Sequence, residues 1–198
     1  MGSTFALAGG VAQLFPASVN FRVRASLWTL AIGAVVLSIV AVASSRSDWS
    51  TGQGRATAQP VQFSHAHHVG GVGIDCRYCH RSVDTEAFAG MPSTQTCMHC
   101  HSQLWTEAAM LAPVRQSWAN GRPLRWRRVH DLPDFAYFDH GAHVQAEVAC
   151  STCHGEVERM ALTVQAAPLT MRWCVDCHAD LPARYGLPAQ LSCSTCHR

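Results

Sequence analysis

The stretch CRYCH at residues 76–80 decides the fold, because its pattern recurs four more times along the chain. The other four units are CMHCH at 97–101, CSTCH at 150–154, CVDCH at 174–178 and CSTCH at 193–197. All ten cysteines of the 198 residues belong to these Cys-x-x-Cys-His units. The chain therefore repeats one chemistry that needs two thiols and an imidazole at a fixed spacing.

Three chemistries compete for paired cysteines: a disulfide framework, a zinc site and a covalent c-type haem. Disulfides do not need a histidine after every second cysteine. Zinc sites usually combine two Cys-x-x-Cys units or add a His-x₃₋₅-His unit, and five units pair awkwardly. A c-type haem needs this pattern, since two thiols form thioethers on one porphyrin edge and the next histidine binds iron. We therefore predict five c-type haems.

Each motif supplies two cysteines and one proximal histidine, the iron ligand next to the thioethers. The predicted haem-binding residues are Cys76, Cys79, His80, Cys97, Cys100, His101, Cys150, Cys153, His154, Cys174, Cys177, His178, Cys193, Cys196 and His197.

The length favours a thin polypeptide around cofactors. Without its first 50 or so residues the chain leaves roughly 30 residues per haem, too few for a conventional core. We expect a mostly irregular and α-helical multihaem cytochrome c whose haems form the apolar interior. The formal charge of +2 is that of the polypeptide without the negatively charged haem propionates. The basic run 121–130 therefore either binds propionates or is a solvated basic strand. We predict no nucleic-acid partner. The arginines of this run are Arg122, Arg125, Arg127 and Arg128.

An apolar segment of 21 residues lies between Arg24 and Arg46 and is long enough to span a bilayer as a helix. A cleaved signal peptide is the alternative, because residues 41–45 (AVASS) offer a cleavage site. We predict a cytoplasmic segment over 1–24, a single transmembrane helix over 25–45, a flexible linker over 46–60 and a periplasmic pentahaem domain over 61–198. Haem attachment outside the bacterial cytoplasmic membrane sets this orientation.

The histidines reveal a duplication. FSHAHH at 63–68 and FDHGAH at 138–143 both match F-x-H-x-x-H, and each precedes two Cys-x-x-Cys-His units. The next cysteine follows the phenylalanine by 13 and 12 residues. Histidines three apart on a helical turn can reach the irons of two neighbouring haems. The predicted distal ligands are His65, His68, His140 and His143.

A fifth distal ligand must lie elsewhere. His130 is our first choice, with Met171 and Met160 as alternatives, and methionine would raise the potential of that haem. Met91 and Met98 are expected to pack against haem faces. His67 remains an alternative to His68, and His99 is expected to be exposed. The fifth motif stands outside the duplication, so we expect electrons to enter or leave there.

Residues 102–121 show helix signals, with Ser102 as N-cap, Asn120-Gly121 as the end and Pro113 dividing two short helices. We interpret Trp105 and Trp118 as ordinary packing residues rather than haem-stacking residues. Residues 131–140 are predicted to be extended and to deliver the second histidine pair.

The intact motifs and spare ligands predict that every iron has two axial ligands. Six-coordinate haems transfer electrons and do not bind substrate, so the chain is expected to be an electron carrier without its own enzymatic activity.

Several segments together resemble the pentahaem cytochrome c subunit of bacterial alternative complex III. They are FSHAHHVGGVGIDCRYCH (63–80), GMPSTQTCMHCH (90–101), RVHDLPDFAYFDHGAH (128–143) and LTMRWCVDCH (169–178), with AQLFP (12–16) before the helix. That family's complex oxidises membrane quinol and passes electrons to periplasmic cytochromes or a haem–copper oxidase. The resemblance implies as partners an iron–sulfur subunit related to molybdopterin oxidoreductases, multi-helix quinol-binding subunits and a monohaem cytochrome c.

The alternative is a self-sufficient, single-helix quinol dehydrogenase that feeds periplasmic reductases. That class marks its first haem motif with a methionine two places after the histidine, whereas Arg81 and Ser82 follow His80 here. The chain also has one motif more than that tetrahaem class.

Overall fold

The computed structural model describes residues 16–197, which form two compact units that meet between Ser47 and Asp48. The predicted AQLFP match (12–16), apart from Pro16, and the predicted cytoplasmic segment up to residue 15 lie outside the described residues.

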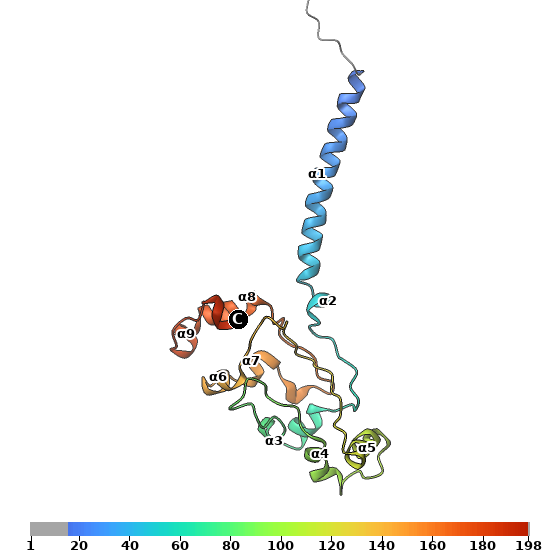
Figure 1. The fold of residues 1–198 in the computed structure, drawn as a ribbon, viewed down its shortest axis with the longest axis vertical. Helices are drawn as coiled ribbons and strands as arrows, with labels where there is room; N and C mark the ends of the chain where they lie inside the picture. Colours follow the sequence, from blue (N-terminus) through green and yellow to red (C-terminus); the bar gives the residue numbers. More distant parts are fainter. Residues whose placement is uncertain (1–15, 198) are drawn as a thin grey trace, which may run out of the picture. The chain divides into compact units, whose positions relative to one another are not determined.

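The first unit contains one long helix, α1, at Ala17–Ser45 (Figure 1). Within residues 18–45, an 18-residue stretch has a mean hydropathy of 2.3, and none of that stretch is buried. The length and composition make α1 a candidate membrane anchor or signal peptide. It begins eight residues before the predicted start at residue 25, with Pro16 as the N-cap residue, so Arg22 and Arg24 lie within the helix.

The second unit consists of short helices joined by long irregular segments, and no strand occurs among residues 48–197 (Figure 1). This agrees with the predicted helical and irregular architecture. The helices are α2 (Asp48–Thr51), η1 (Ala66–Gly71, π-helical), α3 (Cys76–Cys79), α4 (Thr94–His101), η2 (Ala109–Leu111), α5 (Ala112–Asn120), α6 (His140–Gln145), α7 (Cys150–His154), η3 (Val157–Arg159), α8 (Met171–Ala179), α9 (Leu181–Tyr185) and α10 (Cys193–Cys196).

The polypeptide itself buries little apolar surface. Among the described residues, the buried apolar side chains are Val61, Val114 and Ala167. Polar contacts join the elements instead, such as the 2.6 Å hydrogen bond between the hydroxyls of Thr94 on α4 and Ser117 on α5. Such a small core is consistent with a unit in which prosthetic groups supply the apolar interior.

Most of the segment expected to be a flexible linker (46–60) belongs to the second unit and is hydrogen-bonded to later residues of that unit. The Gly54 amide donates to the Gln165 carbonyl at 2.8 Å, and the Gln53 side chain donates to the Ala166 carbonyl at 2.7 Å. Gln59 exchanges two side-chain hydrogen bonds with the backbone of Arg127. Long-range hydrogen bonds thus order a segment in which the sequence offers no periodic pattern.

The helix prediction over 102–121 was correct at its end and wrong at its beginning. Gly121 ends α5 at φ 62°, and Pro113 lies in its first turn. Ser102, however, is the C-cap of α4 and has helical dihedrals, whereas an N-cap residue is extended. The preceding motif continues the helix up to His101, and the chain then turns through Trp105 at φ 57°.

Candidate haem-binding sites

Each Cys-x-x-Cys-His unit forms one turn of helix, in α3, α4, α7, α8 and α10. Cysteines three positions apart therefore lie on the same side of their turn. In the first unit, the Asp75 carboxylate caps the turn by accepting from the Arg77 amide at 2.8 Å, and the His80 amide donates to the Cys76 carbonyl at 2.9 Å. The local fold thus presents both thiols and the imidazole together, as covalent haem attachment requires.

Four of the five motif histidines have a carbonyl partner at Nδ1. The pairs are His80 with Gly90 at 2.8 Å, His101 with Leu104 at 3.1 Å, His178 with Gln190 at 3.3 Å and His197 with Phe135 at 2.9 Å. A carbonyl accepts only from a protonated nitrogen, so Nδ1 carries the hydrogen and Nε2 is free to bind metal.

The two F-x-H-x-x-H segments have nearly the same side-chain geometry. Phe63 stacks on His68 at 4.4 Å between ring centroids and meets His65 edge-on at 4.9 Å. In the second segment the corresponding distances are 4.3 Å for Phe138 and His143 and 4.8 Å for Phe138 and His140. One phenylalanine thus fixes the orientation of both imidazoles in each pair.

Hydrogen bonds at Nδ1 also orient all four paired histidines. Within each segment the second histidine contacts a carbonyl four residues earlier: Ser64 for His68 at 2.9 Å, and Asp139 for His143 at 2.7 Å.

The first histidine of each pair has a partner far away in the sequence. The Thr163 hydroxyl lies 2.9 Å from Nδ1 of His65, and the Ala87 carbonyl lies 2.8 Å from Nδ1 of His140. Nε2 of each ring is therefore the nitrogen available to a metal.

The distances between imidazoles fit an iron held from two sides. Two imidazoles on opposite faces of one metal, each at about 2 Å, have ring centroids roughly 6 Å apart. The centroids lie 6.1 Å apart for His68 and His101, 6.2 Å for His140 and His154, and 6.0 Å for His143 and His178. His65 is close enough to His80 for the charge of one to lower the pKa of the other.

His130 lies against His154, at 4.3 Å between centroids and an interplanar angle of 74°. This separation is too short for an iron between the two rings. Its Nε2 is nevertheless buried and has no hydrogen-bond partner. Among the described residues, the ring that contacts His197 is Phe135, with 6.0 Å between the ring centroids.

Burial keeps the central imidazoles neutral. Desolvation, followed by the charges of His130 and His140, lowers the pKa of His154 to about 4. Desolvation, followed by His80 and His68, lowers the pKa of His65 to about 4. A neutral imidazole is the form that binds iron.

The donor set fits c-type haem better than the two alternatives. All ten cysteines are free of disulfide bonds. Within residues 16–197, no group of three or more His, Cys, Asp or Glu side chains converges as a metal-ion site. Two buried nitrogens without partners, His130 Nε2 and Trp126 Nε1, further suit a group that offers a metal and carboxylates.

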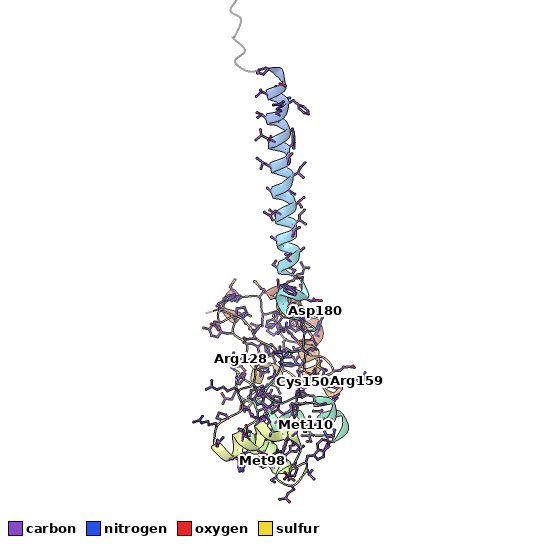
Figure 2. The ribbon with its side chains drawn as sticks, turned by 90° about the vertical axis from the view of Figure 1, so that its right-hand side faces the viewer. Met98, Met110, Arg128, Cys150, Arg159 and Asp180 are labelled. Carbon is purple, nitrogen blue, oxygen red and sulfur yellow. The ribbon has the colours of Figure 1, made fainter. Side chains whose placement is uncertain are left out.

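The remaining predicted residues occupy varied positions. His67 lies beside Trp105 at 6.2 Å rather than beside a motif histidine, and His99 is exposed and contacts the Tyr78 hydroxyl at 2.8 Å. Met171 is 67% exposed at the start of α8. Figure 2 labels Met98 on α4.

The arginines of residues 122–128 are all exposed. Arg128 bonds to Asp131 at 3.1 Å (Figure 2). Arg127 lines a polar cavity of about 480 Å³ with Arg55 and Asp131.

Sequence reasoning missed the partners that orient the imidazoles. Most are backbone carbonyls, which no residue pattern marks, and Thr163 lies 98 positions from His65. Gly90 did carry a signal, because its φ of 80° favours glycine and brings its carbonyl to His80.

Comparisons with known proteins agree with this chemistry. Residues 41–118 match the class III cytochrome c family, and residues 136–198 match the family of cytochrome c7 and related cytochromes c. A protein of Nitratidesulfovibrio vulgaris described as "Menaquinone reductase, multiheme cytochrome c subunit" is 36% identical over 105 residues. That match covers 51% of this chain and 48% of the relative, so the chain spans about half the relative's length. The two matched segments together contain all five Cys-x-x-Cys-His units, so the chain is similar to multihaem cytochromes c of the class III and c7 kind, families that bind c-type haem covalently.

Proposed function

We propose that this chain is the electron-transfer subunit of a quinol-oxidising respiratory complex of the alternative complex III kind, with five covalently bound haems. The geometry of the paired histidines carries the proposal. In both modules an F-x-H-x-x-H segment holds imidazoles about 6 Å from motif histidines, as axial ligation from two sides requires. Haems with two axial ligands supply electron transfer and offer no open face to a substrate.

The proposed ligand pairs follow the duplication. His65 and His68 complete the irons bound by His80 and His101, while His140 and His143 complete those bound by His154 and His178. The position of His68 beside His101 favours it over His67. For the motif of His197, His130 remains the proposed distal ligand, and its orphaned Nε2 supports a metal role. The contact of His130 with His154 means that this ligation requires movement of the His130 loop.

The residues around the imidazoles set how readily each iron gives up its electron. Carbonyl acceptors at Nδ1 make the ligands more basic and hold their planes fixed. Exposed Arg125 and Arg128 and the cavity arginines Arg55 and Arg127 are proposed to neutralise propionates.

We place the haem domain on the periplasmic side of the bacterial cytoplasmic membrane, with α1 as an uncleaved single-pass anchor. The composition of α1 supports this placement, as does the need of covalent haem attachment for an extracytoplasmic compartment. The partners are then the iron–sulfur, quinol-binding and monohaem subunits of such a complex, or a haem–copper oxidase that accepts its electrons.

The relative from N. vulgaris is described as a subunit of a menaquinone reductase, which supports the opposite direction of electron flow, from the haems to quinone. Electrons can pass along a row of haems in either direction, and the reduction potentials of the electron donor and acceptor decide which direction is favoured. The self-sufficient quinol dehydrogenase is the third reading, which the surplus fifth motif disfavours.

The test is purification of the full chain from its membrane in mild detergent, with haem quantitation, identification of bound proteins and quinol assays. We expect five haems per chain, co-purifying membrane subunits, and electron transfer between quinol and the haems only in the complex. Fewer than five haems would refute the count, and full quinol oxidation by the isolated chain would refute the subunit role. Electron transfer from reduced haems to quinone, with none from quinol, would assign the reductase direction.

A further inference from the structure

The spatial order of the five motifs differs from their order in the sequence. They are numbered here along the chain as motif 1 (76–80), motif 2 (97–101), motif 3 (150–154), motif 4 (174–178) and motif 5 (193–197). The inference rests on the proposed function, because it needs a haem at each motif.

Motifs 1 and 2 are neighbours. The variable residue Tyr78 of motif 1 contacts His99, the variable residue of motif 2, at 2.8 Å. The first histidine pair also bridges them, since His68 lies beside His101 and His65 interacts electrostatically with His80.

Motifs 3 and 4 are also neighbours, because the second histidine pair bridges them. Helix α6 places His140 at 6.2 Å from His154 of motif 3 and His143 at 6.0 Å from His178 of motif 4, measured between ring centroids. Three residues of one helix therefore separate the ligands of two haems.

Motifs 1 and 3 are joined by a reciprocal exchange between the two modules. The segment after motif 1 holds the second histidine pair, because the backbone amide and Nδ1 of His140 both contact the Ala87 carbonyl. The segment after motif 3 holds the first pair, through Thr163 at His65 and through the Met160 carbonyl, which accepts from Ala66 at 3.0 Å.

This exchange is tightly packed. A Cβ on Gly70 of η1 would collide with the carbonyl oxygen of Glu158 on η3. Along the vertical axis of the two views, motif 3 lies between motifs 2 and 4. Helix α7 lies between α4 and α8 in Figure 1, and Cys150 lies between Met98 and Asp180 in Figure 2.

Motif 5 adjoins motif 4. The Gln190 carbonyl lies 3.3 Å from Nδ1 of His178, and the Gln190 amide donates to the His178 carbonyl at 3.2 Å. Gln190 stands three residues before Cys193, so motif 5 starts beside motif 4.

We infer that the five motifs form one unbranched line in the order 2–1–3–4–5, with motifs 2 and 5 at its ends. The two modules therefore join through their first motifs, motif 1 and motif 3. Electrons are exchanged with partners at motif 2 and motif 5, and each transfer along the line oxidises one iron and reduces its neighbour.

The thiols support the same order. The cysteines of adjoining motifs lie close enough to interact electrostatically: Cys97 with Cys79, Cys76 with Cys150, Cys153 with Cys177, and Cys174 with Cys196. These four pairs are the four contacts of the proposed line.

The direct test is NMR of the fully reduced holoprotein, in which low-spin ferrous haems are diamagnetic. We expect nuclear Overhauser contacts between haem substituents for the pairs 1–2, 1–3, 3–4 and 4–5. A contact between haems 2 and 3, or between haem 5 and any haem other than 4, would overturn the order. Haem quantitation on the same sample separates this outcome from failure of the proposed function, which would appear as fewer than five haems.

An independent test perturbs single haems in the full chain. An axial methionine raises the reduction potential of its haem, and this haem is then reduced before its neighbours. The reduced iron carries one positive charge less, which lowers the reduction potentials of the adjacent haems. Under His68→Met we expect the potential of haem 1 alone to fall, and under His140→Met those of haems 1 and 4. A fall at haems 3, 4 or 5 in His68→Met would contradict the order, and the NMR contacts decide it if a variant does not fold.

Discussion

The two modules, residues 63–101 and 138–178, reach the same arrangement of rings on different backbones. The phenylalanine–histidine distances agree between them to within about 0.1 Å. The first pair, however, leads into the π-helix η1, whereas the second lies in the α-helix α6. The ring geometry is therefore the feature that both modules keep.

A difference of one residue accounts for the two backbones. The first module has 13 residues from phenylalanine to cysteine and the second has 12. A π-turn takes up one residue more than an α-turn. In η1 the Val72 amide donates to the His67 carbonyl at 2.9 Å, five residues back. The extra residue is thus absorbed after the histidines, where it does not move their rings.

Removal of an axial ligand should have the largest effect on this comparison. We expect His68→Ala and His143→Ala each to leave one iron with a single protein ligand, giving one high-spin, CO-binding haem per chain. Absorption and EPR spectra of the holoprotein measure the change. His67→Ala is the matched control, because His67 is exposed and lies beside Trp105, and it should keep all haems low-spin. An unchanged spectrum in His68→Ala would contradict the proposed pair.

A methyl group at the contact between the modules should have the next largest effect. In Gly70→Ala the new Cβ meets the Glu158 carbonyl, and we expect a loss of about 2 kcal/mol in unfolding free energy, within the range for overpacking. Denaturant titration measures it. Gly71→Ala is the control in the same helix, since its Cβ would lie 3.7 Å from the Ala66 carbonyl, an ordinary contact. Alanine favours a helix more than glycine does, so equal losses in both variants would argue against the clash with Glu158 as the cause.

The shared phenylalanine should affect both modules alike. Phe63→Leu and Phe138→Leu remove the stacking on His68 and His143, and we expect each to cost about 1 kcal/mol. Each freed imidazole can rotate, which should change the EPR g-values of one haem. If the spectrum changed in only one of the two variants, contacts other than the phenylalanine would hold the imidazoles in the unaffected module.

The smallest effect is expected where the modules differ. Thr163→Val removes the hydroxyl beside Nδ1 of His65 and should cost about 0.5 kcal/mol, near the lower limit for a hydrogen bond because the site is half-buried. The potential of the motif 1 haem should rise, since His65 becomes a less basic ligand. A redox titration tests this. Thr152→Val is the control. It makes the same substitution at an exposed position of α7 and should leave the potential of the motif 1 haem unchanged.

Local covalent chemistry explains how much could be predicted. The thioether motif needs fixed spacing within one helical turn, so its five copies and their histidines are visible in the sequence, as is the duplicated histidine pair. The partner of Nδ1 in His140 is a backbone carbonyl 53 residues away, and no residue type marks it. Ser102 is not an N-cap because α4 begins at Thr94 and runs through the motif to His101, so that Ser102 lies at the C-terminal end of this helix.

The sequence by itself predicted c-type haem, the apolar N-terminal helix and the repeated order of histidine and cysteine motifs, because each is marked by residue types at regular spacings along the chain. Only the tertiary structure decided which histidines face each other and how the motifs follow in space. Hydrogen bonds such as His65 with Thr163 and His140 with Ala87 cross between modules, and such pairings depend on the whole folded chain. They join motif 1 to motif 3 and so separate the order in space from the order in the sequence.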